Sequence, residues 1–394
     1  MTNANTAGTP AHRLRTAIVG CGVIGRQHAQ VVTANGDLEL VALIDVVESA
    51  ATALAGTVED QTHKQRPATY ATLAAALRDS DIDLVAICTP SGLHSDLAVE
   101  ALRAGKHVII EKPIDVDLPS ARRVAEAAAA ATGQVTSVIS QHRFDPASVA
   151  VASAVRSGRF GKITSGVASL AWWRAQNYYD SGEWRGTWEL DGGGAVMNQG
   201  VHSVDLLLWF LGTPVQIQAH TALLAHERIE VEDTAVATVR FASGALAVIH
   251  CTTAAYPGLT ARIQVHGERG SAVVDNDRLQ YFHAADNAPA GESGSSYGLA
   301  GAGNQAELEV GAHDASANTK GADDLQTAHQ KQYADVVEAI RTGKEPRVGV
   351  NEATAALATV RALYVSATLG TAVHFEDVLA GKYDDVTVHT GGDA

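Results

Sequence analysis

The chain has 394 residues, and its 44 acidic and 29 basic side chains give a formal net charge of −15. This length favours two domains over one, and a composition with 46% hydrophobic and 19% charged residues excludes disordered, collagen-like and disulfide-scaffold proteins. The excess of acid argues against a nucleic-acid or anionic-membrane partner, because few cations are left to neutralise phosphates, and it favours a small-molecule ligand.

The sequence carries no signal for export, for a membrane span or for a metal site. Residues 1–13 lack the apolar stretch of a signal peptide and are expected to form a disordered tail, and no apolar run approaches the ~18 residues of a membrane helix. Cys21, Cys88 and Cys251 are widely spaced and form no CxxC pair, which is typical of reduced thiols in the cytoplasm. The missing export signal and these thiols together lead us to expect a cytoplasmic protein. No cluster of side chains has metal-ligand spacing, so we expect the protein to work without a metal.

From residue 14 onward, apolar strands alternate with segments of helical spacing. The expected strands are 15–20, 38–45, 83–90, 107–113 and 135–140. The expected helices are 23–34, 48–54, 70–78, 95–104 and 119–132. Strands that are apolar throughout and alternate with helices predict an α/β fold with a doubly wound parallel sheet, so we expect a Rossmann domain over residues 14–144.

After residue 144 the pattern changes to successive strands separated by Gly and Pro turns. A helix at 148–156 precedes a strand at 162–173 and a helix near 195–211. The strands that follow are expected at 214–224, 231–241, 245–254, 261–267, 271–275 and 278–283. Residues 284–326 are predicted to form a long loop, helices 327–342 and 351–369 follow, and a polar tail ends the chain. We therefore expect a second α/β domain, 145–394, with an open, mostly antiparallel sheet, and helix 351–369 packing back on the first domain.

A glycine motif marks a dinucleotide site between the first strand and the first helix. Gly20, Gly22 and Gly25, with Val23 and Ile24 between the last two, form GxGxxG, which lets a backbone turn approach a pyrophosphate at a helix N-terminus. Asp45 ends the second strand 20 residues after Gly25 and is followed by two valines rather than an arginine. A carboxylate there binds both ribose hydroxyls and repels a 2′-phosphate, so NAD is the predicted cofactor.

Two further strand ends lie at the same expected edge of the sheet, where ligands of such folds bind. Thr89 and Pro90 end one strand and His94 follows, as cofactor contacts or as a turn and a helix start. Glu111 and Lys112 end the next strand before Pro113. A lysine whose pKa is lowered by burial is able to act as acid or base at a substrate hydroxyl, whereas the alternative is a surface lysine at a loop.

The glycine motif, EKP (111–113) and GGGAVMNQGVHSVDLLLW (192–209) together resemble the Gfo/Idh/MocA family of sugar and polyol dehydrogenases over roughly residues 14–375. The resemblance implies a Rossmann domain followed by an α/β domain with an open, mostly antiparallel sheet. It also implies that Lys112 and His202 are catalytic, that Glu111 contacts the cofactor, and that the Lys112–Pro113 peptide is a candidate cis bond. Without the resemblance, His202 reads equally as a core histidine.

One residue departs from the family pattern. Many family members carry Asp four residues before the histidine, where this chain has Asn198, which cannot take a proton. A three-membered relay is therefore in doubt, and Asn198 is expected to position a substrate hydroxyl. We expect His202 to be the base and Lys112 to orient the hydroxyl, although the sequence leaves their order open. Asp205, one turn further on, is expected to be structural.

Aromatic and basic residues suggest how a sugar is held. Residues 171–194 contain four tryptophans and two arginines, and aromatic faces with a few donors suit a carbohydrate ring, although core aromatics are the alternative. By the resemblance, Trp184 and Arg185 reach the cofactor. The expected substrate contacts, beside Asn198, are Arg143, Trp173, Arg174, Tyr178 and His329.

These patterns predict an NAD-dependent enzyme that oxidises a secondary ring hydroxyl to a ketone. Within the family, WWR, WRGTW and MNQGVH resemble bacterial levoglucosan dehydrogenases, which form 3-keto-levoglucosan. Inositol dehydrogenase, glucoside 3-dehydrogenase and anhydrofructose reductase are the alternatives, and an NAD-binding regulatory protein is the non-enzymatic one. The open sheet face predicts a homo-oligomer, a dimer or a tetramer.

Overall fold

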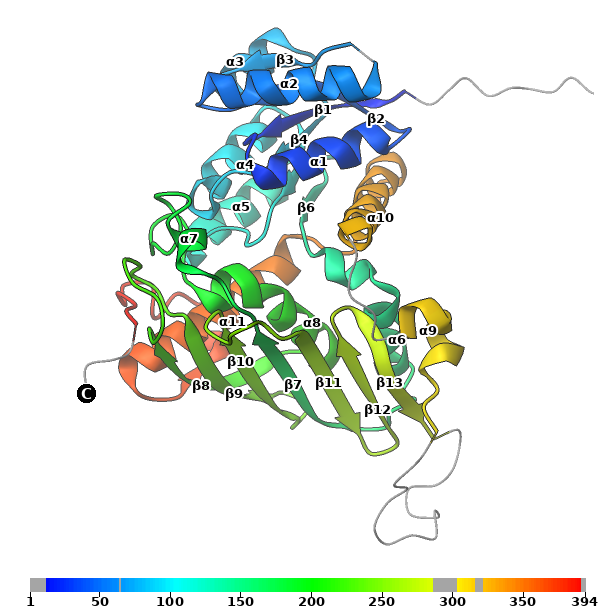
Figure 1. Cartoon of the computed structure of the whole chain (residues 1–394), viewed down its shortest axis with the longest axis vertical. Coiled ribbons are helices and arrows are strands. Elements are labelled where there is room, and N and C mark those ends of the chain that lie inside the picture. Colours follow the sequence, from blue (N-terminus) through cyan, green and yellow to red (C-terminus); the bar gives the residue numbers. More distant parts are fainter. Residues whose placement is uncertain (1–11, 64, 286–302, 316–321, 391–394) are drawn as a thin grey trace, which may run out of the picture.

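The computed structural model describes residues 12–63, 65–285, 303–315 and 322–390, which form two sheets one above the other (Figure 1). Most of the expected tail, residues 1–11, and the middle of the expected loop, residues 286–302, lie outside this description.

The first sheet is parallel throughout and has the strand order β3-β2-β1-β4-β5-β6. Its strands are β1 (Leu14–Val19), β2 (Leu38–Ile44), β3 (Ala68–Tyr70), β4 (Leu84–Ile87), β5 (His107–Ile110) and β6 (Thr136–Val138). The order reverses between β1 and β4, which is the switch point where doubly wound sheets bind dinucleotides. The predicted parallel sheet is confirmed. The strand β3 was missed, and the helix expected at 70–78 begins only at Leu73, after Thr72 caps it.

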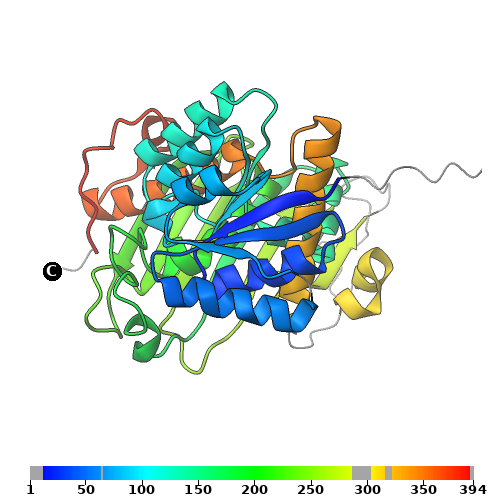
Figure 2. The same cartoon turned by 90° about the horizontal axis from the view of Figure 1, so that it is seen from above.

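Helices cover both faces of the first sheet. One face packs against α1 (Val23–Ala34), α2 (Glu48–Thr62) and α10 (Ala322–Thr342), which supplies Tyr333, Val336 and Val337 to that core. The other face packs against α3 (Leu73–Asp79), α4 (His94–Arg103) and α5 (Leu118–Ala130). Figure 2 shows the strands between these two layers. The late helix α10 therefore belongs to the packing of the first sheet.

The second sheet is mixed, with the order β13-β12-β11-β7-β10-β9-β8-β14. Its strands are β7 (Ile163–Ala171), β8 (Pro214–Ala222), β9 (Thr234–Phe241), β10 (Leu246–Thr252), β11 (Ala261–Gly267), β12 (Gly270–Asp275), β13 (Arg278–Ala284) and β14 (Val373–His374). Every pair is antiparallel except β7 with β10, so the expected mostly antiparallel sheet is confirmed.

One face of this sheet is covered by three helices. These are α6 (Pro146–Arg156), α8 (Val201–Leu211) and α11 (Val350–Leu369), and the sheet lies in front of α8 and α11 in Figure 1. Helix α11 contacts β8 on one side and α5 on the other. The opposite face carries exposed apolar side chains, among them Val236, Leu246 and Val248.

Two expectations about the C-terminal third were wrong. The loop expected at 284–326 contains α9 (Ala306–Ala315) and the first turn of α10. Helix α9 is kinked at Gly311, so it shows no helical period, and its Glu309 pairs with Arg159 of the α6–β7 turn. The polar tail contains β14 and α12 (Phe375–Leu379), which bury Val373 and Phe375 in the hydrophobic core.

Short helical segments link these elements near the sheet ends. They are η1 (Ser91–Leu93), η2 (Gln141–Phe144), α7 (Gln176–Tyr179) and the π-helical turn η3 (Ala195–Gly200). Within the described ranges, none of the helices combines the length and the apolar character that a membrane crossing requires.

Candidate active site

The glycine motif forms a tight turn that leaves the N-terminus of α1 open. A Cβ on Gly25 would lie 1.9 Å from the carbonyl oxygen of Gly20, so the turn and the helix approach too closely for any side chain. A Cβ on Gly22, in contrast, would meet nothing within 4 Å. Gly22 is the N-cap of α1, and no side chain in the described ranges occupies the backbone N–H groups at this helix end. This open cradle of backbone N–H groups fits a pyrophosphate.

Asp45 follows β2 and faces the same turn. Its Oδ2 accepts a hydrogen bond from the Cys21 backbone N–H at 2.8 Å, and its Oδ1 accepts one from Val47 N–H at 2.8 Å. The carboxylate is thus fixed beside the glycine turn. The neighbouring Val46 is 88% exposed and offers no cation to a 2′-phosphate. The residues present fit NAD.

His94 links the loops that follow β4 and β5. Its ring nitrogens lie 2.8 Å from the carbonyl oxygen of Pro113 and 3.0 Å from that of Thr89, and the ring is buried. Both nitrogens therefore contact backbone carbonyls, and the ring links the two strand ends. The sequence had suggested His94 as a cofactor contact, but neither ring nitrogen is left to face a cofactor. Thr89 and Pro90 remain at the ligand-binding edge of the sheet, between β4 and η1.

Lys112 lies directly beyond β5, and the Lys112–Pro113 peptide is cis, as the family resemblance implied. Its Nζ donates a hydrogen bond to the backbone carbonyl of Asn198 at 2.8 Å. Burial lowers the pKa of Lys112, the carboxylates of Glu111 and Asp191 oppose this, and the cations Arg185 and Arg174 add to it. The amine is thus easier to deprotonate than an ordinary lysine.

His202 lies in the first turn of α8, on the side of the cavity opposite the glycine turn. Burial holds the pKa of His202 well below its ordinary value, and positive charge on His142 and Lys112 adds to the effect. The preceding turn η3 is fixed by the buried Glu232, which accepts the N–H groups of Gly194 and Val196 at 2.9 Å. A Cβ on Gly194 would lie 1.7 Å from the Glu232 carbonyl oxygen, which explains the glycine.

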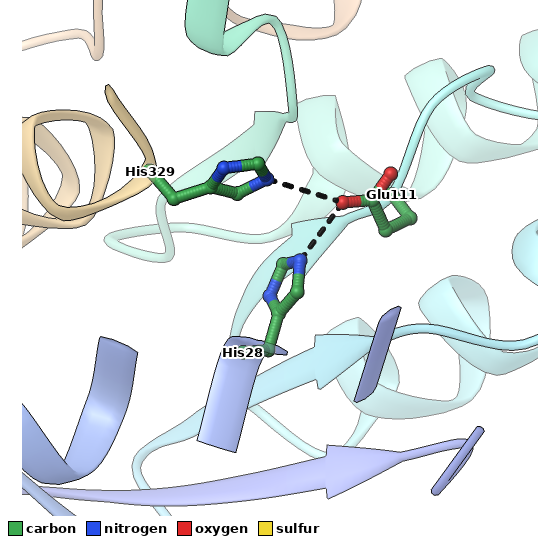
Figure 3. A group of neighbouring side chains, drawn as sticks. All are labelled: His28, Glu111 and His329. Atoms are coloured by element: carbon green, nitrogen blue, oxygen red, sulfur yellow. Dashed lines mark hydrogen bonds and ion pairs between the residues drawn. The ribbon is translucent and has the colours of Figure 1, made fainter. Parts of the chain in front are cut away.

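Glu111 is held by two histidines that come from distant segments (Figure 3). Its Oε1 lies 2.8 Å from His28 Nε2 and 3.7 Å from His329 Nε2. Burial alone would raise the pKa of Glu111, but these two histidines hold it well below its usual range. Because the carboxylate only accepts, His28 Nε2 donates to it, and His28 Nδ1 accepts from the Tyr333 hydroxyl at 2.7 Å.

His142 lies between two carboxylates. Its Nδ1 is 2.9 Å from Asp145 Oδ2 and 2.8 Å from Asp277 Oδ1. Burial alone would lower the pKa of His142, but the two carboxylates raise it to about 9. Asp277 and its neighbour Asn276 have φ of 66° and 51° and form the two-residue turn between β12 and β13. An Asn-Asp pair between two strands is the sequence signal that predicts such a turn.

Both three-residue groups escaped the sequence analysis because each of them joins segments that are far apart in the chain: His28, Glu111 and His329 in one, and Asp277 with the 142–145 segment in the other. In each group the possible ligand atoms lie within 4.8 Å of one another. The 2.8 Å and 2.9 Å contacts within them are hydrogen-bond distances. We describe both as hydrogen-bonded charge clusters that flank the cavity.

A cavity of about 420 Å³ lies between the two sheets and joins these groups. Ile24 of α1 and Glu111 line it on the side of the first sheet, and Leu170 and Ile263 line it on the side of the second. Its polar lining residues are Glu111, Lys112, Gln141, His142, Asn198, Gln199, His202, Ser203, Asn276, Asp277 and His329. The expected residues Lys112, His202, Asn198 and His329 are therefore brought to one space.

The structure directs two of the expected substrate contacts elsewhere. Arg143 is buried and donates to both carboxylate oxygens of Asp205, at 2.8 Å and 2.6 Å, so it anchors α8 instead of lining the cavity. Trp173 packs against Tyr256, and it is Trp172 that lines the cavity. Successive residues point to opposite sides of an extended chain, and the sequence did not show which tryptophan faces inward.

The remaining expected residues form a polar network beside Asn198. Gln199 accepts from Arg174 Nη2 at 2.9 Å and donates to the Tyr178 hydroxyl at 2.9 Å. That hydroxyl also accepts a hydrogen bond from Arg185 Nη1 at 2.7 Å, and the Arg185 guanidinium lies 4.4 Å from the ring centre of Trp184. The network thus borders the cavity. Gln199 was not singled out from the sequence, and neither was Asp191, which bonds the Asn198 side chain.

Comparisons with known proteins agree with this arrangement. A family model described as an oxidoreductase family with an NAD-binding Rossmann fold matches residues 14–139, and one described as a GFO/IDH/MocA C-terminal domain matches residues 148–273. Inositol 2-dehydrogenase of Rhizobium meliloti (strain 1021) is 31% identical over 67% of this chain and 76% of that protein. 1,5-Anhydro-D-fructose reductase of Ensifer adhaerens is 33% identical over 51% of this chain and 60% of its own.

Among solved structures, the WlbA dehydrogenase from Bordetella pertussis in complex with NADH and UDP-GlcNAcA is similar over 93% of this chain and 99% of that chain. The TM-score is 0.79 and the identity is 30%. The similarity therefore covers most of the chain.

Proposed function

The chain belongs to the GFO/IDH/MocA family of NAD-binding oxidoreductases, and from this premise we propose that it oxidises a secondary ring hydroxyl of a sugar, anhydrosugar or inositol to a ketone. The observation that carries the proposal is that Lys112 and His202 line the same cavity, which is also lined by Ile24 of the helix that follows the glycine turn. NAD supplies the hydride acceptor. The glycine turn would hold its pyrophosphate, and Asp45 would hold its ribose hydroxyls.

Lys112 is the better candidate for the immediate proton acceptor. His202, with a pKa held well below its ordinary value by burial and by neighbouring cations, is a weak base. The pKa of Lys112 is also lowered by burial, which makes its neutral amine accessible, while Glu111 and Asp191 stabilise the ammonium that forms. The assignment reverses the order expected from the sequence: Lys112 takes the hydroxyl proton, and neutral His202 orients the hydroxyl by hydrogen bonding.

The cavity suits a small polyhydroxylated ring. Trp172, Leu170 and Leu206 give it an apolar wall, and Asn198, Gln199 and Asn276 give it neutral hydrogen-bonding groups. The named activities of the relatives, inositol dehydrogenation and anhydrofructose reduction, support this class of substrate. Within it we propose oxidation of levoglucosan at C3, with inositols, glucosides oxidised at C3 and anhydrofructose as the alternatives.

A substrate panel tests the proposal. The protein is incubated with NAD and, separately, levoglucosan, myo-inositol, scyllo-inositol and a glucoside, and with NADH and anhydrofructose, while NADH absorbance is followed. We expect one anhydrosugar or polyol to give turnover. Measurable NAD binding without turnover on any of them would refute the enzymatic proposal and favour a regulatory NAD-binding protein.

We also propose that the protein is a cytoplasmic homo-oligomer that assembles through the uncovered face of the second sheet. Val236, Leu246 and Val248 are 44%, 57% and 43% exposed on that face. Apolar side chains on an open sheet favour association with a second copy. Light scattering on the purified protein is expected to give a dimer or a tetramer, and a monomer at micromolar concentration would refute this.

A further inference from the structure

The buried carboxylate of Asp191 bonds the side chain of Asn198, the residue whose backbone carbonyl bonds Lys112. Lys112 Nζ donates to the backbone carbonyl of Asn198 at 2.8 Å, and the Asn198 side chain donates from Nδ2 to Asp191 Oδ1 at 2.5 Å. Asp191 is 2% exposed, and its Oδ2 accepts the Gly186 N–H at 2.8 Å. Both oxygens of Asp191 are therefore fixed, and one of them fixes Asn198.

The amide of Asn198 has a single orientation in this network. Its Nδ2 donates to Asp191, and its Oδ1 accepts from Gln199 Nε2 at 3.2 Å. An amide carries no charge, so Asn198 cannot balance a protonated lysine. Asp191 is able to do so, because it lies on the far side of that amide and interacts electrostatically with Lys112.

The charged and titratable groups around Lys112 come from several elements. They are Glu111 next to it, Asp191 and Arg185 in the segment before η3, Arg174 after β7 and His202 on α8. Glu111 is already bonded by His28, with His329 at 3.7 Å. No histidine in the part of the chain that the structure describes bonds Asp191, and the charged groups that act on it include the cations Lys112 and Arg185. Its charge is thus directed to the cationic side of the site.

We propose that Asp191 is a positioning residue of the reaction: it orients Asn198 and supplies the negative charge that balances Lys112 after proton transfer. The inference rests on the proposed function of Lys112. In the step concerned, the hydroxyl proton passes to Lys112 Nζ, the carbinol hydride passes to NAD, and the carbonyl double bond forms. One positive charge appears on Nζ as the one on the nicotinamide disappears, so a nearby fixed anion favours the product side at the lysine.

The protonation of Asp191 is consistent with this role. Burial raises its pKa to about 6, while the Gly186 N–H, the Asn198 amide and the charges of Lys112 and Arg185 act against burial. The carboxylate is therefore ionised above about pH 6.

Three variants test the proposal: Asp191→Asn, Asn198→Asp and the double variant. We expect Asp191→Asn to lower kcat about tenfold or more and to move the pH limb of Lys112 to lower pH, because the ammonium loses its counter-charge. NADH affinity, measured by fluorescence, is expected to stay within about threefold. The double variant returns a carboxylate to the network, one hydrogen bond away, and is expected to recover most of the kcat and the position of the limb.

Asp180→Asn is the matched control, because Asp180 lies in the same segment but pairs with Arg228 at the surface. Two results overturn the proposal: unchanged kcat and pH limb in Asp191→Asn, or a fall in kcat with an unmoved limb and no recovery in the double variant. Should Asp191→Asn not fold, Asn198→Asp alone decides, since added negative charge must move the limb to higher pH. Failure of the proposed function looks different, because Lys112→Ala would then retain activity.

Discussion

The ring of His142 stands edge-on to the ring of His202, with the centroids 4.8 Å apart and the planes at 76°. The two carboxylates beside His142 raise its pKa to about 9, so it is a cation at neutral pH. A second imidazolium at this distance is unfavourable, which, after burial, helps to hold His202 neutral. The cluster of His142, Asp145 and Asp277 thus helps to set the protonation state of His202, although it does not itself take the hydroxyl proton.

Asp277→Asn tests this coupling. We expect the pKa of His142 to fall, because one of the two opposing carboxylates is lost, and the pKa of His202 to rise part of the way toward its ordinary value, since burial remains. Titration of the histidine ring protons by NMR measures both. A His202 titration identical to that of the wild type would show that His142 exerts no electrostatic effect on it.

Lys112→Ala is expected to lower kcat about a thousandfold, because the proton acceptor of the hydroxyl is removed. NAD affinity should change by no more than about threefold, since the glycine turn and Asp45 are untouched. Single-turnover NADH formation and tryptophan quenching by NAD separate the two quantities. Lys331→Ala, on the outer side of α10, serves as the control, and full activity in Lys112→Ala would exclude its assigned role.

Asp45→Ser is expected to weaken NAD binding about tenfold and to narrow the preference for NAD over NADP. The carboxylate accepts two backbone N–H groups, which fixes it where the ribose hydroxyls would lie, and its charge opposes a 2′-phosphate. The measurement is kcat/KM with each cofactor. Equal rates of the wild type with NAD and NADP would contradict the role of Asp45.

Stability is expected to fall as the pH drops below about 6.5. Burial lowers the pKa of His28, so the folded state holds it neutral while the unfolded state binds a proton at its ordinary pKa. Its contribution is fully present above that value and is lost as the pH falls below it. His28→Gln removes the contribution and should lower stability by about 2 kcal/mol at pH 7.5, because the single amide group does not reproduce both hydrogen bonds of the ring, to Glu111 and from the Tyr333 hydroxyl.

The check is urea denaturation at pH 7.5 and pH 5.5. The difference between the two pH values is expected to be smaller in His28→Gln than in the wild type, and a difference of equal size would rule out His28 as the source. His313→Gln, on the exposed part of α9, is the control.

The sequence was sufficient for features that depend on local pattern. The parallel sheet and the glycine turn follow from strand periodicity and from a motif at a strand end. The pairing of Lys112 with His202 was implied by the family resemblance, and the structure brings both to one cavity. What it could not provide is the choice of partner between distant segments. His142 of η2 pairs with Asp277 of the turn between β12 and β13, and Arg143 bonds Asp205 of α8. The packing of the helices on the second sheet brings these partners together.

Local breaks in pattern had the same effect on the secondary structure. Gly311 interrupts α9 with a φ of 81°, so its helical turns show no common apolar face. Trp172 and Trp173 are chemically equivalent in the sequence, and only the pairing of β7 with its neighbours decides that the first faces the cavity.

Helix α10 has a consequence for synthesis of the chain. Its Tyr333, Val336 and Val337 complete the core on one face of the first sheet, and Gln332 accepts the Ser140 N–H and donates to the Val138 carbonyl beside β6. During translation the six strands of that sheet leave the ribosome long before α10 does. The part of the protein that is made first is therefore completed last, and a nascent chain that stops before α10 exposes an apolar surface that a chaperone has to cover.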